Sequence, residues 1–328
     1  MDIGIKGLLR SLATGLALAL TLSFLSSCVP HPNPPLVFGA NVWPGYETIY
    51  LARELNYYDP AKVHLAAYSN ASQVIRAFHN RILQAAAVTL DEALLLQQDI
   101  PDLRIILVFD SSNGADAMLA QPGITTLQQL KGRRIGVEKT ALGAYFLSLA
   151  LGSANMDAGQ VTVVSLSVDE HETAFRAGKV DAVVTFEPVR TRLLRSHARQ
   201  LFDSSRAPGK IIDVLVTRAE YMRPYRDELS LLVQGWHRAQ QTIQKEPDTA
   251  IPIMAARERV SAAEFRDLLT GISLTDLTQN RALLANAGAE LKSSAASMQD
   301  YLVQQGLLQR KADISRLFDE SIIARVKP

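Results

Sequence analysis

From Leu36 onward, short runs of Val, Ile and Leu alternate with stretches of helical pattern, and this alternation leaves few folds open to the chain. Runs this short and apolar are typical of buried parallel strands. Strand and helix in regular alternation predict an α/β protein with mainly parallel sheets. The expected strands are 36–42, 63–68, 85–88, 104–109, 134–137, 161–166, 181–185 and 211–217. The helical patterns between them cover 47–55, 72–80, 91–98, 141–151, 170–177 and 188–196.

After Arg218 the strand-like pattern ends and helices are expected up to the C-terminus. Ser261 followed by Glu264 has the spacing of a capping box. The 286–288 turn and Gly306 are typical helix ends. The expected helices are 225–245, 248–258, 262–269, 278–287, 293–305 and a last one near 314–318.

A loop-rich stretch at 111–126 interrupts the alternation, and a second βα series follows it. The strand expected at 211–217 then offers a return to the first series. We therefore predict two α/β lobes joined by two crossings, with a ligand between them. Lobe one comprises 36–120 plus 216–328, including the helical C-terminal region, and lobe two comprises 121–215.

The first residues have the pattern of a bacterial export signal. Lys6 and Arg10 precede an apolar stretch at 12–25, which is shorter than the ~20 residues of a membrane-spanning helix. Leu25-Ser26-Ser27-Cys28 resembles a lipobox, the site at which bacteria attach diacylglycerol to cysteine. We predict a signal peptide at 1–27 and a proline-rich tether at 28–35 that begins with lipidated Cys28. The alternative is an ordinary secretory signal with an incidental cysteine.

Composition argues against several classes of function. Cys28 is the single cysteine, so neither an intramolecular disulfide nor a thiolate metal site is expected. The chain has 34 Lys plus Arg and 33 Asp plus Glu, and removing the signal leaves 32 of each. A nucleic-acid-binding protein normally carries a basic excess. His171-Glu172 begins like a metalloprotease helix but lacks the second histidine, and no phosphate loop, dinucleotide fingerprint or nucleophile elbow occurs. We expect no enzyme, cofactor, metal or nucleic-acid partner.

Ligands of parallel α/β sheets gather at the carboxyl ends of strands, where helix N-termini present free N–H groups. The residues at these junctions are the candidate ligand contacts. They are Trp43, Tyr46, Ser69, Thr89, Asp91, Ser112, Thr140, Leu142, Gly143, Glu187 and Asp213.

Carboxylates dominate these junctions, and Lys139 is the one base nearby. The acids are Asp91, Glu92, Asp169, Glu170, Glu187 and Asp213. Such a site suits an amine, an amidine or a nitrogen heterocycle, and Trp43 and Tyr46 would add cation–π faces. Structural alternatives stay open: helix capping for Asp91, Asp169, Glu170 and Thr140, core packing for Trp43, and an ion pair with Arg190 for Glu187.

Four segments resemble one family in the same order. They are 43–52 (WPGYETIYLA), 86–93 (AAVTLDEA), 130–137 (LKGRRIGV) and 179–188 (KVDAVVTFEP). These segments are similar to ABC-importer solute-binding proteins for nitrate, sulfonate, taurine and thiamine-precursor pyrimidines. The resemblance implies a two-lobed type II periplasmic-binding fold and capture of a small solute for a permease and its ATPase.

The sequence thus predicts a monomeric, lipid-anchored solute-binding protein of the bacterial cell envelope, facing the periplasm or the cell exterior. The expected ligand is a nitrogen-containing organic solute of taurine/sulfonate-like or pyrimidine-like class. The alternative is a solute-sensing lipoprotein that reports to a signalling partner.

Overall fold

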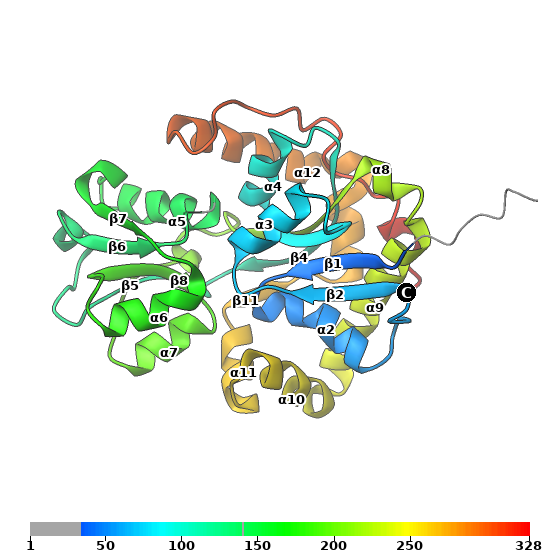
Figure 1. Ribbon diagram of the computed structural model, residues 1–328, viewed down its shortest axis with the longest axis horizontal. Coiled ribbons are helices and arrows are strands. Elements are labelled where there is room, and N and C mark those ends of the chain that lie inside the picture. The colour runs from blue at the N-terminus through cyan, green and yellow to red at the C-terminus, as the bar shows by residue number, and fades with distance from the viewer. Residues whose placement is uncertain (1–33, 140) are drawn as a thin grey trace, which may run out of the picture. The chain divides into compact units, whose positions relative to one another are not determined.

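Two β-sheets organise the computed structural model, which describes residues 34–139 and 141–328 (Figure 1). Sheet A has six strands in the order β11-β4-β10-β3-β1-β2, and sheet B has five in the order β7-β6-β8-β5-β9. The predicted signal peptide and Cys28 lie outside the described residues.

Sheet A combines parallel and antiparallel strands. β1 (Leu36–Ala40) pairs in parallel with β2 (Val63–Ala67) and β3 (Ala85–Thr89). β10 (Ile212–Arg218) lies antiparallel between β3 and β4 (Leu103–Ser112). The short β11 (Ile272–Leu274), which the sequence did not predict, completes the edge beside β4.

Sheet B is also mixed. β6 (Arg134–Val137) runs parallel to β7 (Thr162–Ser165) and β8 (Ala182–Phe186). β5 (Asp116–Ala120) runs antiparallel to β8 and to β9 (Arg199–Asp203). The predicted α/β class is confirmed, but the prediction of mainly parallel sheets needs correcting, because β5, β9, β10 and β11 all pair antiparallel.

Alternation along β5 explains how sheet B packs on both faces. Met118 and Ala120 share a core with Phe146 of α5 (Ala141–Gly152). Ala117 and Leu119 point the other way, toward α6 (Val168–Arg176) and α7 (Val189–Arg195). Successive side chains of a strand face opposite sides, and Figure 1 shows α5 on one side of the sheet and α6 and α7 on the other.

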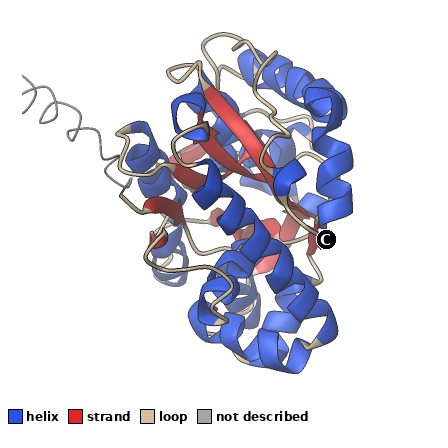
Figure 2. Ribbon diagram, turned by 90° about the vertical axis from the view of Figure 1, so that its right-hand side faces the viewer, coloured by secondary structure: helices blue, strands red, loops and turns tan. Residues whose placement is uncertain are grey.

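Sheet A carries the remaining helices around a single core. Figure 1 shows α3 and α4 on one face and α2 on the other, and Figure 2 shows the strands enclosed by helices. The helices are α2 (Glu47–Glu54), α3 (Ala71–His79), α4 (Leu90–Gln97), α8 (Ala219–Met222), α9 (Arg226–Lys245), α10 (Pro247–Glu258), α11 (Ala262–Leu269) and α12 (Leu277–Gln304). Short 3-10 turns lie at Pro44–Tyr46, Leu127–Leu130, Ala158–Gln160, Ser204–Arg206 and Ile323–Arg325.

The C-terminal helices pack on sheet A, with Trp236 of α9 and Phe318 in the same core as β1 and β4. The helix end predicted at 286–288 is not found, because α12 continues through it. Asn286 and Gly288 nevertheless have φ of 53° and 71°, so the backbone departs locally from regular helix.

The chain passes between the sheets twice, from β4 to β5 and from β9 to β10. The two connections are bonded to each other: the hydroxyls of Ser112 and Ser204 are 2.8 Å apart, and the Gly114 N–H donates to Ser204 Oγ at 2.6 Å. The division into two lobes stays a prediction. The sheets do not follow its boundaries: β5 falls in the predicted lobe one but belongs to sheet B, and β10 starts in the predicted lobe two, at Ile212, but belongs to sheet A.

A search of the helices in 34–139 and 141–328 finds none that combines the length and apolar character of a membrane span.

Candidate functional site

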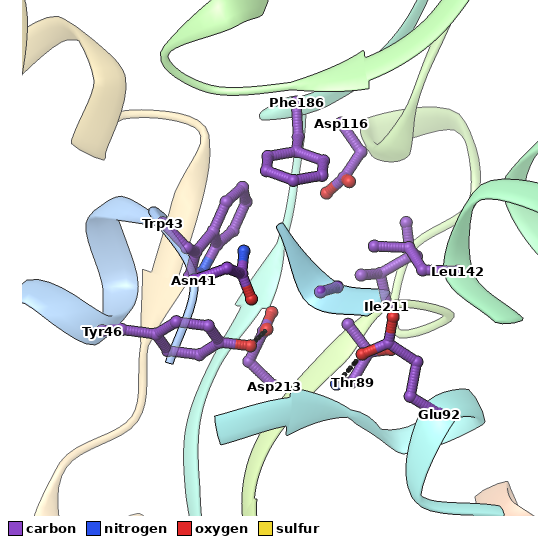
Figure 3. Close-up of a pocket in the computed structure, with 11 residues that line it drawn as sticks. Asn41, Trp43, Tyr46, Thr89, Glu92, Asp116, Leu142, Phe186, Ile211 and Asp213 are labelled. Atoms are coloured by element: carbon purple, nitrogen blue, oxygen red, sulfur yellow. Dashed lines mark hydrogen bonds between the residues drawn. The ribbon is translucent and has the colours of Figure 1, made fainter. Parts of the chain in front are cut away.

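A small cavity lies where the ends of strands from both sheets meet. Its volume is about 20 Å³. The segment after β1, the end of β3, the first turns of α3 and α4, and the start of β10 supply one side, and β5, β8 and the first turn of α5 supply the other. The lining residues are Asn41, Trp43, Tyr46, Ala71, Thr89, Glu92, Asp116, Leu142, Phe186, Ile211 and Asp213 (Figure 3). We call this the inner cavity.

Trp43 is held against the cavity by a buried carboxylate. Its indole N–H lies 3.3 Å from both oxygens of Asp110 at the end of β4. The intervening Gly45 permits this approach, because a Cβ there would lie 1.9 Å from Asp110 Oδ2. The indole packs edge-to-face with Phe186 from sheet B, with ring centroids 5.8 Å apart and planes at 79°. Trp43 therefore reaches across to the other sheet.

Tyr46 and Asp213 form the floor of the inner cavity, and Figure 3 shows the phenol pointing at the carboxylate. The Tyr46 hydroxyl donates to Asp213 Oδ1. Asp213 lies directly opposite Asp110 in the β4–β10 ladder. Burial and the repulsion between these two carboxylates raise the pKa of Asp213, and burial raises that of Asp110 to about 7. Two facing buried carboxylates resist joint ionisation, so the pair retains a proton near neutral pH.

Glu92 and Asp116 bring incompletely bonded carboxylates to the inner cavity. Glu92 Oε2 accepts the Thr89 N–H at 3.1 Å, but Glu92 Oε1 and Asp116 Oδ2 have no hydrogen-bond partner among the residues that the structure describes. Burial raises the pKa of Glu92 to about 8, and the nearby Asp91 adds to the rise. Burial likewise raises the pKa of Asp116 to about 7. A buried polar atom without a partner is costly, so these oxygens are suited to receive a hydrogen-bond donor.

A second cavity of about 20 Å³ adjoins the first and shares Ala71, Glu92, Asp116, Leu142 and Phe186 with it. Gly143 lines it, and a Cβ there would lie 2.1 Å from the Glu138 carbonyl oxygen. His171 closes its far side, and burial lowers the pKa of this histidine to about 4. His171 is thus neutral at ordinary pH and adds no positive charge.

A third space, an open groove of about 590 Å³, is also lined by Phe186, and we call it the outer groove. Ser69 and Glu187 lie along it. Glu187 is 1% exposed and both of its oxygens are engaged: Arg190 donates at 2.7 Å, and the N–H and hydroxyl of Thr191 donate at 3.1 and 3.0 Å. These contacts match the ion-pair alternative for Glu187 and leave its carboxylate little capacity for a ligand.

The candidate contacts fall into four groups. Trp43, Tyr46, Thr89, Leu142 and Asp213 come together around the inner cavity, and Gly143 lines the adjoining one. Ser69 and Glu187 lie on the outer groove. Asp91 and Ser112 are buried and line none of these spaces. Thr140 lies outside the described residues.

Sequence reasoning missed several lining residues. Glu92 was counted among the acids of the junctions but not among the contacts. Asp116 is the first residue of β5 and Phe186 the last residue of β8, and neither is among the expected contacts. The antiparallel direction of β5 explains Asp116, because the first residue of an antiparallel strand reaches the same sheet edge as the last residue of its neighbour.

Two mixed sheets, joined by two connections with a cavity at their facing edges, make up the periplasmic-binding-protein fold. The chain belongs to the family described as NMT1/THI5 like, whose model matches residues 43–250, more than half of the sequence.

Individual relatives are more distant. A Brucella abortus protein, named as a candidate binding protein, is 29% identical over 185 residues, which are 54% of this chain and 55% of that protein. The chain thus matches about half the length of this relative. The alkanesulfonate-binding protein SsuA of Xanthomonas axonopodis pv. citri, solved with MOPS bound, has a TM-score of 0.75 at 17% identity, covering 88% of this chain and 99% of SsuA. The desulfurization enzyme DszB has a TM-score of 0.62 at 18% identity, covering 89% and 98%.

Proposed function

We propose that this protein is the extracytoplasmic solute-binding component of an ABC importer, and that it captures a small, positively charged, nitrogen-containing organic solute in the inner cavity. Family membership and fold support solute binding. The charge of the cavity supports the class of solute.

One observation carries the proposed ligand class: Glu92, Asp116 and Asp213 line a buried cavity whose described lining residues include no Lys or Arg. Glu92 and Asp116 each keep one oxygen without a hydrogen-bond partner in the described part of the chain. An ammonium or amidinium group would donate to these oxygens and, as an adjacent positive charge, would lower the raised pKa values of Glu92 and Asp116 and so favour their ionised forms. A hydrogen bond to an ionised group is worth ~1.5–3 kcal/mol. The faces of Trp43 and Phe186 would add cation–π attraction.

A sulfonate or nitrate fits this cavity poorly. An anion among three carboxyl groups would be repelled by any that is ionised, and no cation among the described lining residues compensates for it. Of the classes that the sequence left open, we therefore favour amines, amidines and aminopyrimidine-like heterocycles over simple sulfonates.

Binding requires the sheets to separate. A cavity of about 20 Å³ accommodates about one water molecule, whereas the proposed solute has several heavy atoms. The two connections joined at Ser112 and Ser204 are the expected hinge, since hinges are short segments between rigid bodies. The closed form would then dock on a permease served by an ATPase.

Anchoring and class of activity are also part of the proposal. We expect export by the N-terminal signal, lipidation of Cys28 and residence in the cell envelope. The fold alone does not separate binding from catalysis, because DszB shares it. We favour binding because two SsuA binding proteins superpose better, with TM-scores of 0.75 and 0.69 against 0.62 for DszB.

The test is a ligand screen by thermal shift followed by calorimetry on the mature protein. Amines, amidines and aminopyrimidines are expected to raise the melting temperature, and alkanesulfonates and nitrate are not. Hits confined to the two anion classes would overturn the proposed solute class. An absence of hits in every class, with a folded protein, would count against solute capture.

A further inference from the structure

Glu138 occupies a position between the N-termini of two helices. Its Oε1 accepts the Ser72 N–H at 2.9 Å and the Ser72 hydroxyl at 2.7 Å, in the first turn of α3. Its Oε2 accepts the Val168 N–H at 3.3 Å, at the start of α6. The residue is 5% exposed. One buried carboxylate is therefore bonded to both helices.

These two helices belong to different sheets. α3 packs against β3 and β1 of sheet A, whereas α6 packs against β6 and β8 of sheet B. Glu138 itself follows β6. A second bond lies beside it, because the Asn70 side-chain N–H donates to Asp169 Oδ1 at 3.1 Å. Glu138 thus holds α3 to sheet B.

A helix N-terminus presents unpaired N–H groups and a partial positive charge, so it attracts anions. An acidic group of a ligand bound between the sheets would be drawn to these N–H groups. Here the chain supplies the acid itself. Glu138 also lines the adjoining cavity, whose lining residues Glu92 and Asp116 are shared with the inner cavity, so it lies next to the proposed ligand site.

We propose that Glu138 is a specificity-determining residue. Its carboxylate occupies the N-termini of α3 and α6, and it therefore excludes ligands that would place an acidic group there, beside the adjoining cavity. The inference rests on the proposed function, since it assumes a solute between the sheets. The same carboxylate also bonds α3, which packs on sheet A, to the elements of sheet B.

Chemical rescue tests this directly. Glu138→Ala frees the Ser72 and Val168 donors and leaves room for a small anion. We expect formate and methanesulfonate to raise the melting temperature of this variant in a saturable way, as binding to the folded state does, and to affect the parent protein far less. The apparent anion affinity of the variant is expected to exceed that of the parent by at least tenfold.

Glu170→Ala is the matched control. Glu170 caps the same helix α6 by accepting the Ser167 N–H at 2.9 Å, but it is exposed and bonded within sheet B's own elements. Its removal is expected to give no anion rescue. Equal responses of Glu138→Ala and the parent protein to both anions would overturn the inference, as would equal rescue of the control.

A measurement on the parent protein covers the case in which the variant does not fold. Methanesulfonate at ~0.1 M is expected to leave the binding of a cationic hit from the screen unchanged beyond ionic-strength effects, which an equal concentration of chloride reproduces. Competition specific to methanesulfonate would overturn the role of Glu138. Failure to find any cationic hit would instead count against the proposed solute class, so the two failures are distinguishable.

Discussion

The indole N–H of Trp43 lies 3.3 Å from both carboxylate oxygens of Asp110, a residue 67 positions further along the chain. Gly45 lies between the two groups, and a Cβ there would lie 1.9 Å from Asp110 Oδ2 and 2.7 Å from the indole nitrogen. Gly45 thus leaves room for the hydrogen bond between Trp43 and Asp110. This bond positions the indole that lines the inner cavity.

Gly45→Ala is expected to destabilise the protein by ~1–3 kcal/mol, because the methyl group displaces a buried, hydrogen-bonded carboxylate. It should also weaken ligand binding, since Trp43 loses its anchor. Gly123→Ala is the control, because among the described residues no heavy atom beyond its two chain neighbours lies within 4 Å of its Cβ position. Denaturant unfolding of both variants checks this, and equal stabilities would contradict it.

Asp116 is expected to make stability depend on pH. Burial raises its pKa from 3.8 to about 7. Between pH 3.8 and about 7 the carboxyl of Asp116 holds a proton in the folded state that it releases in the unfolded state. The contribution of this protonated carboxyl to the free energy of unfolding is therefore complete below about pH 3.8 and is lost as the pH rises toward 7. Asp116→Asn mimics the protonated form at every pH. It should therefore stabilise the protein more at pH ~8 than at pH ~5, by on the order of 2 kcal/mol at ~1.4 kcal/mol per pKa unit.

The control for this prediction is Asp313→Asn. Asp313 is exposed, and the backbone N–H of Ser315 lowers its pKa, which is the opposite direction. Asp313→Asn should therefore not become more stable relative to the parent protein as the pH rises. Thermal unfolding across this pH range measures both variants, and a pH-independent effect of Asp116→Asn would contradict the expected role.

The sequence predicted the fold class well because periodicity reports on burial. Strands β1, β3 and β6 are apolar runs, and their junctions lie where parallel pairing requires them. Strand direction is harder to predict from the sequence, because β10 would have the same apolar character in a parallel and in an antiparallel pairing. β11 has three residues, too few for any period to show.

The candidate site was predictable only in part, for a related reason. Asp91 and Glu92 are adjacent in the first turn of α4, and sequence cannot decide which one faces the cavity. The structure places Glu92 there. Glu187 precedes Arg190 by one helical turn, so a local ion pair competes with ligand binding, and its geometry favours the pair.

Cys28→Ser tests the anchor. The thioether-linked lipid is the expected membrane attachment, and stable anchoring takes more than one acyl chain. The variant should move from the membrane fraction to the soluble fraction after cell lysis. Ser27→Ala keeps a small residue before the cysteine and should stay with the membranes. Unchanged fractionation of Cys28→Ser would count against lipidation.

Glu92 and Glu187 should give opposite results when each is replaced. Glu92→Gln keeps the size of a side chain that lines the inner cavity and removes the carboxyl group that a bound cation would ionise. We expect affinity for a cationic solute to fall at least tenfold, which is ~1.4 kcal/mol, because a charge-assisted bond is lost. Stability should rise slightly at pH ~8, where the buried carboxyl, whose pKa is about 8, begins to ionise at a cost.

Glu187→Ala should instead lower stability and spare binding. It leaves the Thr191 N–H and Nη1 of Arg190 without their acceptor, although Nε and Nη2 of Arg190 stay bonded to Gln200. Losing one partner of a largely buried pair costs ~1–3 kcal/mol. Affinity for the cationic solute should change less than threefold, because neither Glu187 oxygen is free to meet a ligand. Calorimetry and thermal unfolding of both variants separate the roles. A tenfold loss of affinity in Glu187→Ala with unchanged stability would reverse the assignment and place the ligand in the outer groove.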